Sequence, residues 1–105
     1  MKLRIFETDS APYELDFNRN RVILGRNPEC DVVFDGDRFP MVSGLHAEIR
    51  QGNTNTLLIH RSRSNKTLCN GDAVTKTVEL RAGDHIRLGF TGPGIELLSL
   101  TERES

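Results

Sequence analysis

Hydrophobic residues alternate with polar ones in short runs along most of the chain, a pattern typical of strands with one face in a core. Such runs occupy residues 2–6, 13–17, 21–25, 31–34, 45–50, 56–60, 67–69, 78–80, 85–89 and 95–100. The segments between them are rich in Gly, Pro, Asn and Asp, which favour turns. No window shows the spacing of an amphipathic helix. We therefore predict an all-β fold, a two-sheet β-sandwich of about ten or eleven short, mainly antiparallel strands.

The length of 105 residues suits one domain with its own core. We expect this domain to occupy residues 1–100, followed by a polar tail at residues 101–105. No apolar run could span a membrane and no signal-peptide pattern is visible, so we expect a cytoplasmic protein without a membrane partner. Cys30 and Cys69 are far apart and lack metal-ligand spacing, which predicts buried thiols, no metal site and no cofactor.

The formal net charge is −1, so no overall basic field would attract nucleic acid. Arg61, Arg63 and Lys66 form a local basic run, and they offer the one sequence feature on which a nucleic-acid binder could be argued. No aromatic residue is interleaved in that run to stack on bases. We therefore expect no nucleic-acid partner.

An enzyme would need a nucleophile with a base in reach and a third group to orient the base. Ser43 and His46 are close in sequence, and Asp84 could complete such a set. However, the chain has no Gly-x-Ser-x-Gly motif and no predicted strand–helix elbow. Asp35 and Asp37 lie in a turn, where Asp is favoured for backbone reasons alone. We expect no catalytic residues and no enzymatic activity.

Four polar residues at the ends of predicted strands have the chemistry of a site that binds a phosphate ester, not of a catalytic site. Arg26 can hold two phosphate oxygens with its guanidinium, and Ser43 and Ser64 supply hydroxyl donors. Asn65 adds an amide, whose donor and acceptor suit a peptide backbone. Each residue alone is most simply a loop residue, so their joint order carries the prediction.

This order resembles the forkhead-associated (FHA) domain. The resemblance is carried by Leu24-Gly25-Arg26, Cys30-Asp31-Val32-Val33, Val42-Ser43-x-x-His46-Ala47-Glu48-Ile49, Ser64-Asn65-x-Thr67-x-x-Asn70-Gly71 and Leu80-x-x-Gly83-Asp84-x-Ile86-x-Leu88-Gly89. It implies a two-sheet β-sandwich that recognises phosphothreonine peptides through loops at one end. The implied partner is a phosphothreonine-containing protein, such as a Ser/Thr kinase substrate, in signalling or assembly.

By position, the resemblance implies that Arg26, Ser43 and Ser64 contact the phosphate. Asn65 matches the residue that bonds the peptide main chain beside the phosphothreonine. His46 resembles a scaffold histidine that ties the binding loops together. The regular continuation of the alternating run at residues 45–50 would place His46 on a strand, on the face opposite its two neighbours.

Glycines and turn residues complete the implied scaffold. Gly25 would allow a close backbone approach, and Asn70-Gly71 is the strongest hairpin signal in the chain. Gly44 stands where the family often has Arg, Lys or Asn, so only its backbone N–H could reach a phosphate. Lys66 replaces the usual Gly after Asn65, which would be strained if that position required positive φ.

Two questions stay open at the level of sequence. Phe39 and Met41 could read a peptide side chain beyond the phosphothreonine, or they could pack beneath their own loop. The departures at Gly44 and Lys66 also leave an alternative function, a degenerate FHA scaffold that binds protein partners independently of phosphate.

Overall fold

The computed structural model describes residues 1–8 and 10–100, so the predicted tail at residues 101–105 lies outside the described residues. Within the described residues there are eleven strands and no helix. The strands are β1 (Lys2–Phe6), β2 (Tyr13–Asp16), β3 (Arg21–Gly25), β4 (Val32–Val33), β5 (Ala47–Gln51), β6 (Thr56–His60), β7 (Thr67–Cys69), β8 (Asp72–Ala73), β9 (Thr77–Leu80), β10 (His85–Leu88) and β11 (Gly94–Ser99). None of the described residues forms a helix long and apolar enough to cross a membrane.

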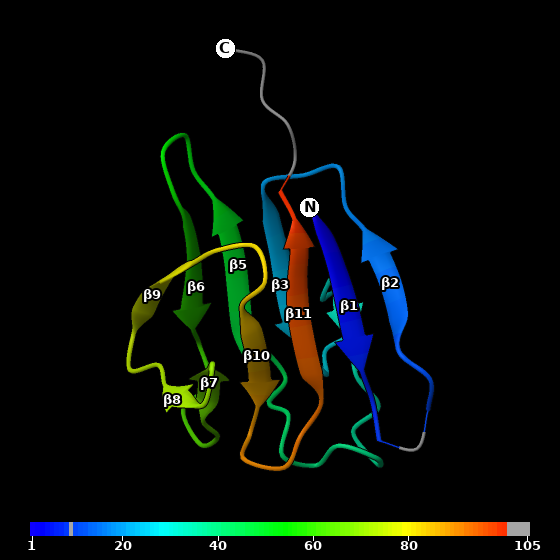
Figure 1. Cartoon of the computed structure of the whole chain (residues 1–105). Coiled ribbons are helices and arrows are strands. Elements are labelled where there is room, and N and C mark those ends of the chain that lie inside the picture. Colours follow the sequence, from blue (N-terminus) through cyan, green and yellow to red (C-terminus); the bar gives the residue numbers. More distant parts are fainter. Residues whose placement is uncertain (9, 101–105) are drawn as a thin grey trace.

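The strands form two sheets that pack face to face (Figure 1). The six-stranded sheet has the order β2-β1-β11-β10-β7-β8, and the five-stranded sheet has the order β4-β3-β5-β6-β9. Only the short β3–β4 pair is parallel among the described strand pairs. The predicted all-β sandwich is therefore confirmed.

The core lies between the sheets and is built from the apolar positions of the alternating runs. In β1, Leu3 and Ile5 are fully buried, whereas Arg4 between them points to the outer face and pairs with Glu14 of β2. The same alternation in β10 and β11 buries one face of each strand. Period-two patterning thus decides which face of each strand enters the core.

The structure corrects the expected position of His46 on a regular strand. β5 begins only at Ala47, and His46 belongs to the loop before it. His46 and Ala47 are both fully buried, whereas Leu45 is 45 % exposed. The alternation fails here because hydrogen bonds of the loop, described below, fix the direction of the imidazole.

Phe39, Met41 and the two cysteines also belong to the core or pack against it. Phe39 is buried and packs edge-on against Phe34, with 6.1 Å between ring centroids, so it supports its own loop. Met41 is half-buried against the same core. Cys30 and Cys69 are free, buried thiols, as predicted.

Candidate phosphopeptide-binding site

Three loops meet at the lower end of the sandwich in Figure 1, and they carry the residues singled out from the sequence. They are the segments 26–31, 34–46 and 61–66, which follow β3, precede β5 and follow β6. β3 pairs with β5, and β5 pairs with β6, so these strand ends are neighbours in one sheet. The rigid sheet therefore holds the three loops side by side.

Gly25 allows the first two loops to touch. Its neighbour Arg26 donates its backbone N–H to the Ser43 carbonyl at 3.1 Å, and the Asn27 N–H bonds the Gly44 carbonyl at the same distance. A Cβ atom added to Gly25 would lie 2.2 Å from the Gly44 carbonyl oxygen, which is a severe clash. Only glycine can occupy this position without separating Arg26 from Ser43.

His46 ties the second loop to the third. Its Nδ1 accepts the Ser43 backbone N–H at 3.0 Å, and its Nε2 lies 2.9 Å from the Lys66 carbonyl oxygen. Because Nδ1 accepts, Nε2 carries the proton and donates it to Lys66. The His46 carbonyl accepts the N–H groups of Arg61 and Ser62 at 2.9 and 3.0 Å.

Burial lowers the pKa of His46 below its ordinary value of 6.5, and the nearby His60 lowers it further, while the Lys66 carbonyl opposes the shift. The neutral imidazole is the form that this geometry needs. A second proton would have to sit on Nδ1, directly against the Ser43 N–H. Both ring nitrogens are already used by the backbone, so His46 has no free nitrogen to act as a base on the Ser43 hydroxyl.

A small cluster of hydroxyl and amide groups joins Ser43 to the third loop. The Ser43 and Ser62 hydroxyl oxygens are 2.5 Å apart, and the Asn65 side-chain amide donates to Ser43 Oγ at 3.1 Å. The Asn65 backbone N–H donates to Ser62 Oγ at 3.0 Å. If Ser62 donates to Ser43, the Ser43 O–H remains available to an acceptor outside the protein. Ser62 is buried and Ser43 is half-buried, so Ser43 is the hydroxyl that a ligand can reach.

Arg26 supplies a cation on the loop whose backbone bonds Ser43. Its side chain is exposed, and within the described part of the chain its guanidinium makes no hydrogen bond and no ion pair. The side chain runs over Gly36, where an added Cβ would lie 3.0 Å from Arg26 Cδ. The loop backbone at Gly36 thus leaves space for the guanidinium, whose five donors remain free for a ligand.

The structure brings together four of the five residues predicted to contact a phosphopeptide. Arg26 and Asn65 each donate a hydrogen bond to Ser43, and Gly44, the next residue, accepts one from Asn27. Ser64 is exposed and takes no part in the hydrogen bonds among the described residues; Ser62, which the sequence reasoning missed, completes the cluster instead. Both serines alternate with arginine in one loop, so no sequence signal distinguishes them.

Asn70 and Gly71 lie away from the three loops, and the backbone of Lys66 is not strained. Asn70 and Gly71 have φ of 51° and 90° and form the tight turn between β7 and β8. Asn70 then accepts the His85 N–H at 2.9 Å, so it supports the start of β10 rather than the three loops. Lys66 is not among the described residues with positive φ, so it carries no left-handed strain.

Gly44 keeps its backbone N–H free, since that group has no acceptor among the described residues. A Cβ at Gly44 would lie 2.8 Å from Asn27 Oδ1. The Asn27 amide thus fills space that a side chain at position 44 would need.

Asp84, the acid considered for a catalytic set, instead bonds Asn70 and the Arg81 backbone N–H. No group of three or more potential metal ligands occurs within residues 1–8 and 10–100.

Comparisons with known proteins agree with this geometry. The family model described as FHA domain matches residues 22–89, which include all three loops. A search of curated proteins finds no match. Among solved structures, the FhaA FHA domain complexed with the intracellular domain of Rv3910 is 26% identical with a TM-score of 0.70, covering 90% of this chain and 97% of that one.

Two further solved structures are similar. The N-terminal FHA domain of S. cerevisiae Rad53p, in complex with a phosphothreonine peptide, is 25% identical with a TM-score of 0.68, covering 92% of this chain and 94% of that chain. The FHA domain of the CT664 protein from Chlamydia trachomatis is 24% identical with a TM-score of 0.73, covering 95% and 97%, which supports the fold. With the family model spanning more than half of its residues, the chain belongs to the FHA domain family.

Proposed function

We propose that this chain is a non-catalytic module that binds phosphothreonine peptides at the three-loop site. The observation that carries the proposal joins two facts. The Arg26 guanidinium has no partner among the described residues, and the Arg26 backbone N–H bonds the carbonyl of Ser43, whose hydroxyl is held by Ser62 and Asn65. A phosphate monoester carries nearly two negative charges and three acceptor oxygens, and an arginine with neighbouring hydroxyl and N–H donors matches it.

Each residue has a distinct role in the proposal. Arg26 holds two phosphate oxygens, and the Ser43 hydroxyl with the Gly44 N–H holds the third. Asn65 orients Ser43 through its amide N–H, which leaves its amide oxygen free to accept an N–H from the peptide main chain. Ser64 is exposed in the same loop, and its hydroxyl, unpaired among the described residues, adds a further donor to the phosphate.

The similar proteins support a phosphorylated protein as the partner. One of them was solved with a phosphothreonine peptide and another with the intracellular domain of a second protein. We propose that this chain likewise recruits a substrate of a Ser/Thr kinase, in the cytoplasm, within a signalling assembly.

The experiment begins with a phosphothreonine peptide library screened against the purified chain. The best peptide is then compared by calorimetry with its phosphoserine and unphosphorylated forms. Losing the charged partner of a guanidinium typically costs about 2–5 kcal/mol, so the unphosphorylated peptide should bind well over tenfold more weakly. The extra methyl of threonine is worth about 0.8 kcal/mol, which predicts a preference over phosphoserine of roughly three- to tenfold.

The alternative function makes the opposite prediction. The missing side chain at Gly44, and the Asn27 amide that occupies its space, favour a scaffold that binds partners without phosphate. Equal affinity for all three peptides would support that scaffold and would exclude the phosphate site. Equal affinity for the two phosphorylated forms alone would remove only the methyl-binding niche.

A further inference from the structure

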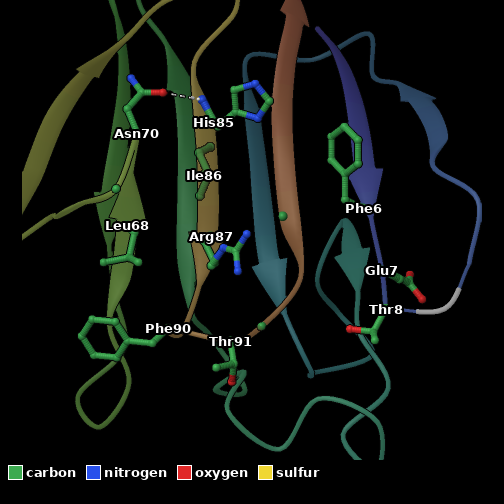
Figure 2. Close-up of a pocket in the computed structure, with 13 residues that line it drawn as sticks. Phe6, Glu7, Thr8, Leu68, Asn70, His85, Ile86, Arg87, Phe90 and Thr91 are labelled. Carbon is green, nitrogen blue, oxygen red and sulfur yellow. Dashed lines mark hydrogen bonds between the residues drawn. The ribbon is translucent and has the colours of Figure 1, made fainter.

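A second concave surface lies on the outer face of the six-stranded sheet, and it contains none of the residues proposed to bind phosphate (Figure 2). This groove has a volume of about 980 Å³. Strand register places Leu68 of β7, Arg87 of β10, Gly94 of β11 and Phe6 of β1 side by side across it. Phe90, which follows β10, borders the same groove.

Gly94 forms the floor of the groove, although the fold does not require glycine at that position. The chain has nine glycines, and eight of them either have positive φ or would bring an added Cβ within 3.0 Å of another atom. At Gly94 the nearest atom would be 3.6 Å away, an ordinary contact, and φ is not positive. Glycine weakens a strand interior, and its presence there often marks the approach of a ligand.

Two aromatic side chains border the groove, in a lining that also includes the polar residues Glu7, Thr8, Asn70, His85, Arg87 and Thr91. Phe90 is 69 % exposed, the largest exposed fraction among the large hydrophobic side chains that the structure describes. Phe6 is half-buried and lies 6.3 Å from the His85 ring, measured between centroids. Figure 2 shows Phe6 and Phe90 at opposite edges of the groove, with Arg87 between them. Phe6 packs beside Gly94, where an added Cβ would lie 3.7 Å from Phe6 Cβ.

The groove contains one arginine and one glutamate, which differ in their partners. Arg87 is exposed and forms no ion pair or hydrogen bond through its side chain within residues 1–8 and 10–100. Glu7, the carboxylate that borders the groove, is already engaged by Arg38 at 3.0 Å and by the Tyr13 hydroxyl at 2.5 Å. The groove therefore combines exposed aromatic surface with one guanidinium that has no partner among the described residues.

We infer that this groove is a second, phosphate-independent docking site for an extended protein segment that carries an aromatic side chain next to a carboxylate. The aromatic ring lies over Gly94 beside Phe6, and the carboxylate pairs with Arg87, which is the cross-strand neighbour of Gly94. The inference goes beyond the proposed function, because no phosphate and no residue of the three-loop site is involved.

The test is an NMR titration of the isotope-labelled full chain with the peptide acetyl-Gly-Glu-Phe-Glu-Gly-amide. We expect saturable shifts of the backbone amides of Arg87, Thr91 and Gly94, and none at Ser43 or Asn65. A peptide with Ala in place of Phe should bind at least about tenfold more weakly, since burial of a phenyl ring is lost. A peptide with Lys in place of both Glu residues should also bind more weakly, because Arg87 would repel it.

Two variants address the groove itself. Gly94→Leu places a side chain in the groove and should abolish the shifts, whereas Ser99→Leu adds the same side chain to an exposed position of β11 and should not. Phe90→Ala changes a residue too exposed to affect folding and should weaken binding several-fold.

Three results would overturn the inference. One is the absence of saturable shifts with the Phe peptide in the folded wild-type chain. Another is unchanged binding in folded Gly94→Leu and in Phe90→Ala. The third is a shift of the groove amides on dilution of the protein alone, which would show that a second copy of the chain occupies the groove.

Discussion

His46 offers the most informative perturbation of the site, because its replacement by alanine removes two hydrogen bonds from a fully buried position. The Ser43 N–H loses its acceptor, which typically costs about 1–3 kcal/mol for a buried group. The Lys66 carbonyl still accepts the Gly89 N–H at 2.7 Å. Losing its hydrogen bond from His46 should therefore cost less stability, about 0.5–1.5 kcal/mol.

The expected destabilisation of His46→Ala is therefore about 2–4 kcal/mol. For a domain of this size, about 4 °C of Tm accompanies each kcal/mol, so we expect Tm to fall by roughly 8–16 °C. Affinity for the selected phosphothreonine peptide should also fall, since the Ser43 and Lys66 loops lose their common support. Calorimetric melting and peptide titration measure the two effects.

His46→Asn separates the two hydrogen bonds. The asparagine amide oxygen can accept the Ser43 N–H in place of Nδ1, but the shorter side chain leaves Lys66 without its donor. The loss should then be only about 1 kcal/mol. His85→Ala is the control, because that imidazole is exposed and its removal should change stability by no more than about 0.5 kcal/mol.

Equal losses in His46→Ala and His46→Asn would refute the reasoning that the unpaired Ser43 N–H is the main cost. Unchanged Tm with lost binding would mean that His46 contacts the ligand directly and does not support the loops. Unchanged Tm and unchanged binding would remove His46 from the account of the site altogether.

Arg26→Ala should weaken binding of the phosphothreonine peptide by well over tenfold, because loss of the charge pair costs about 2–5 kcal/mol of binding free energy, while Tm stays unchanged. Calorimetry tests this against the control variant Arg63→Ala, which also removes an exposed arginine, and an unaltered affinity of Arg26→Ala would contradict it. Because the folded pKa of His46 lies below 6.5, the folded state resists protonation, and stability should fall as pH decreases from about 8 to 5. Melting of His46→Asn should lack this loss; an identical pH profile would exclude His46 as its source. Burial alone would raise the pKa of Glu48, but hydrogen bonds from Arg50 and Arg61 lower it below 4.5. A further loss of stability should therefore begin as pH falls to about 4.5, and melting of Glu48→Gln should show a smaller loss.

The sequence alone determined the sandwich and the order of its strands along the chain. Alternation fixes which face of a strand is buried, as at Leu3 and Ile5, and Asn70-Gly71 specifies a tight turn because both residues tolerate positive φ. The motif order identified Arg26, Ser43 and Asn65 as neighbours although 39 positions separate the first from the last. These features could be predicted because they depend on local periodicity, turn chemistry and the order of motifs along the chain.

Tertiary structure decided what local patterns do not encode. Ser62 and Ser64 occupy equivalent positions in one polar loop, and only the approach of Ser43 from another loop selects Ser62. His46 lies within the alternating run at residues 45–50, yet two backbone partners from different loops hold it off the strand. The groove over Gly94 likewise exists only because β1, β7, β10 and β11 pair in one sheet, since side chains on four separate strands become neighbours through register and not through sequence.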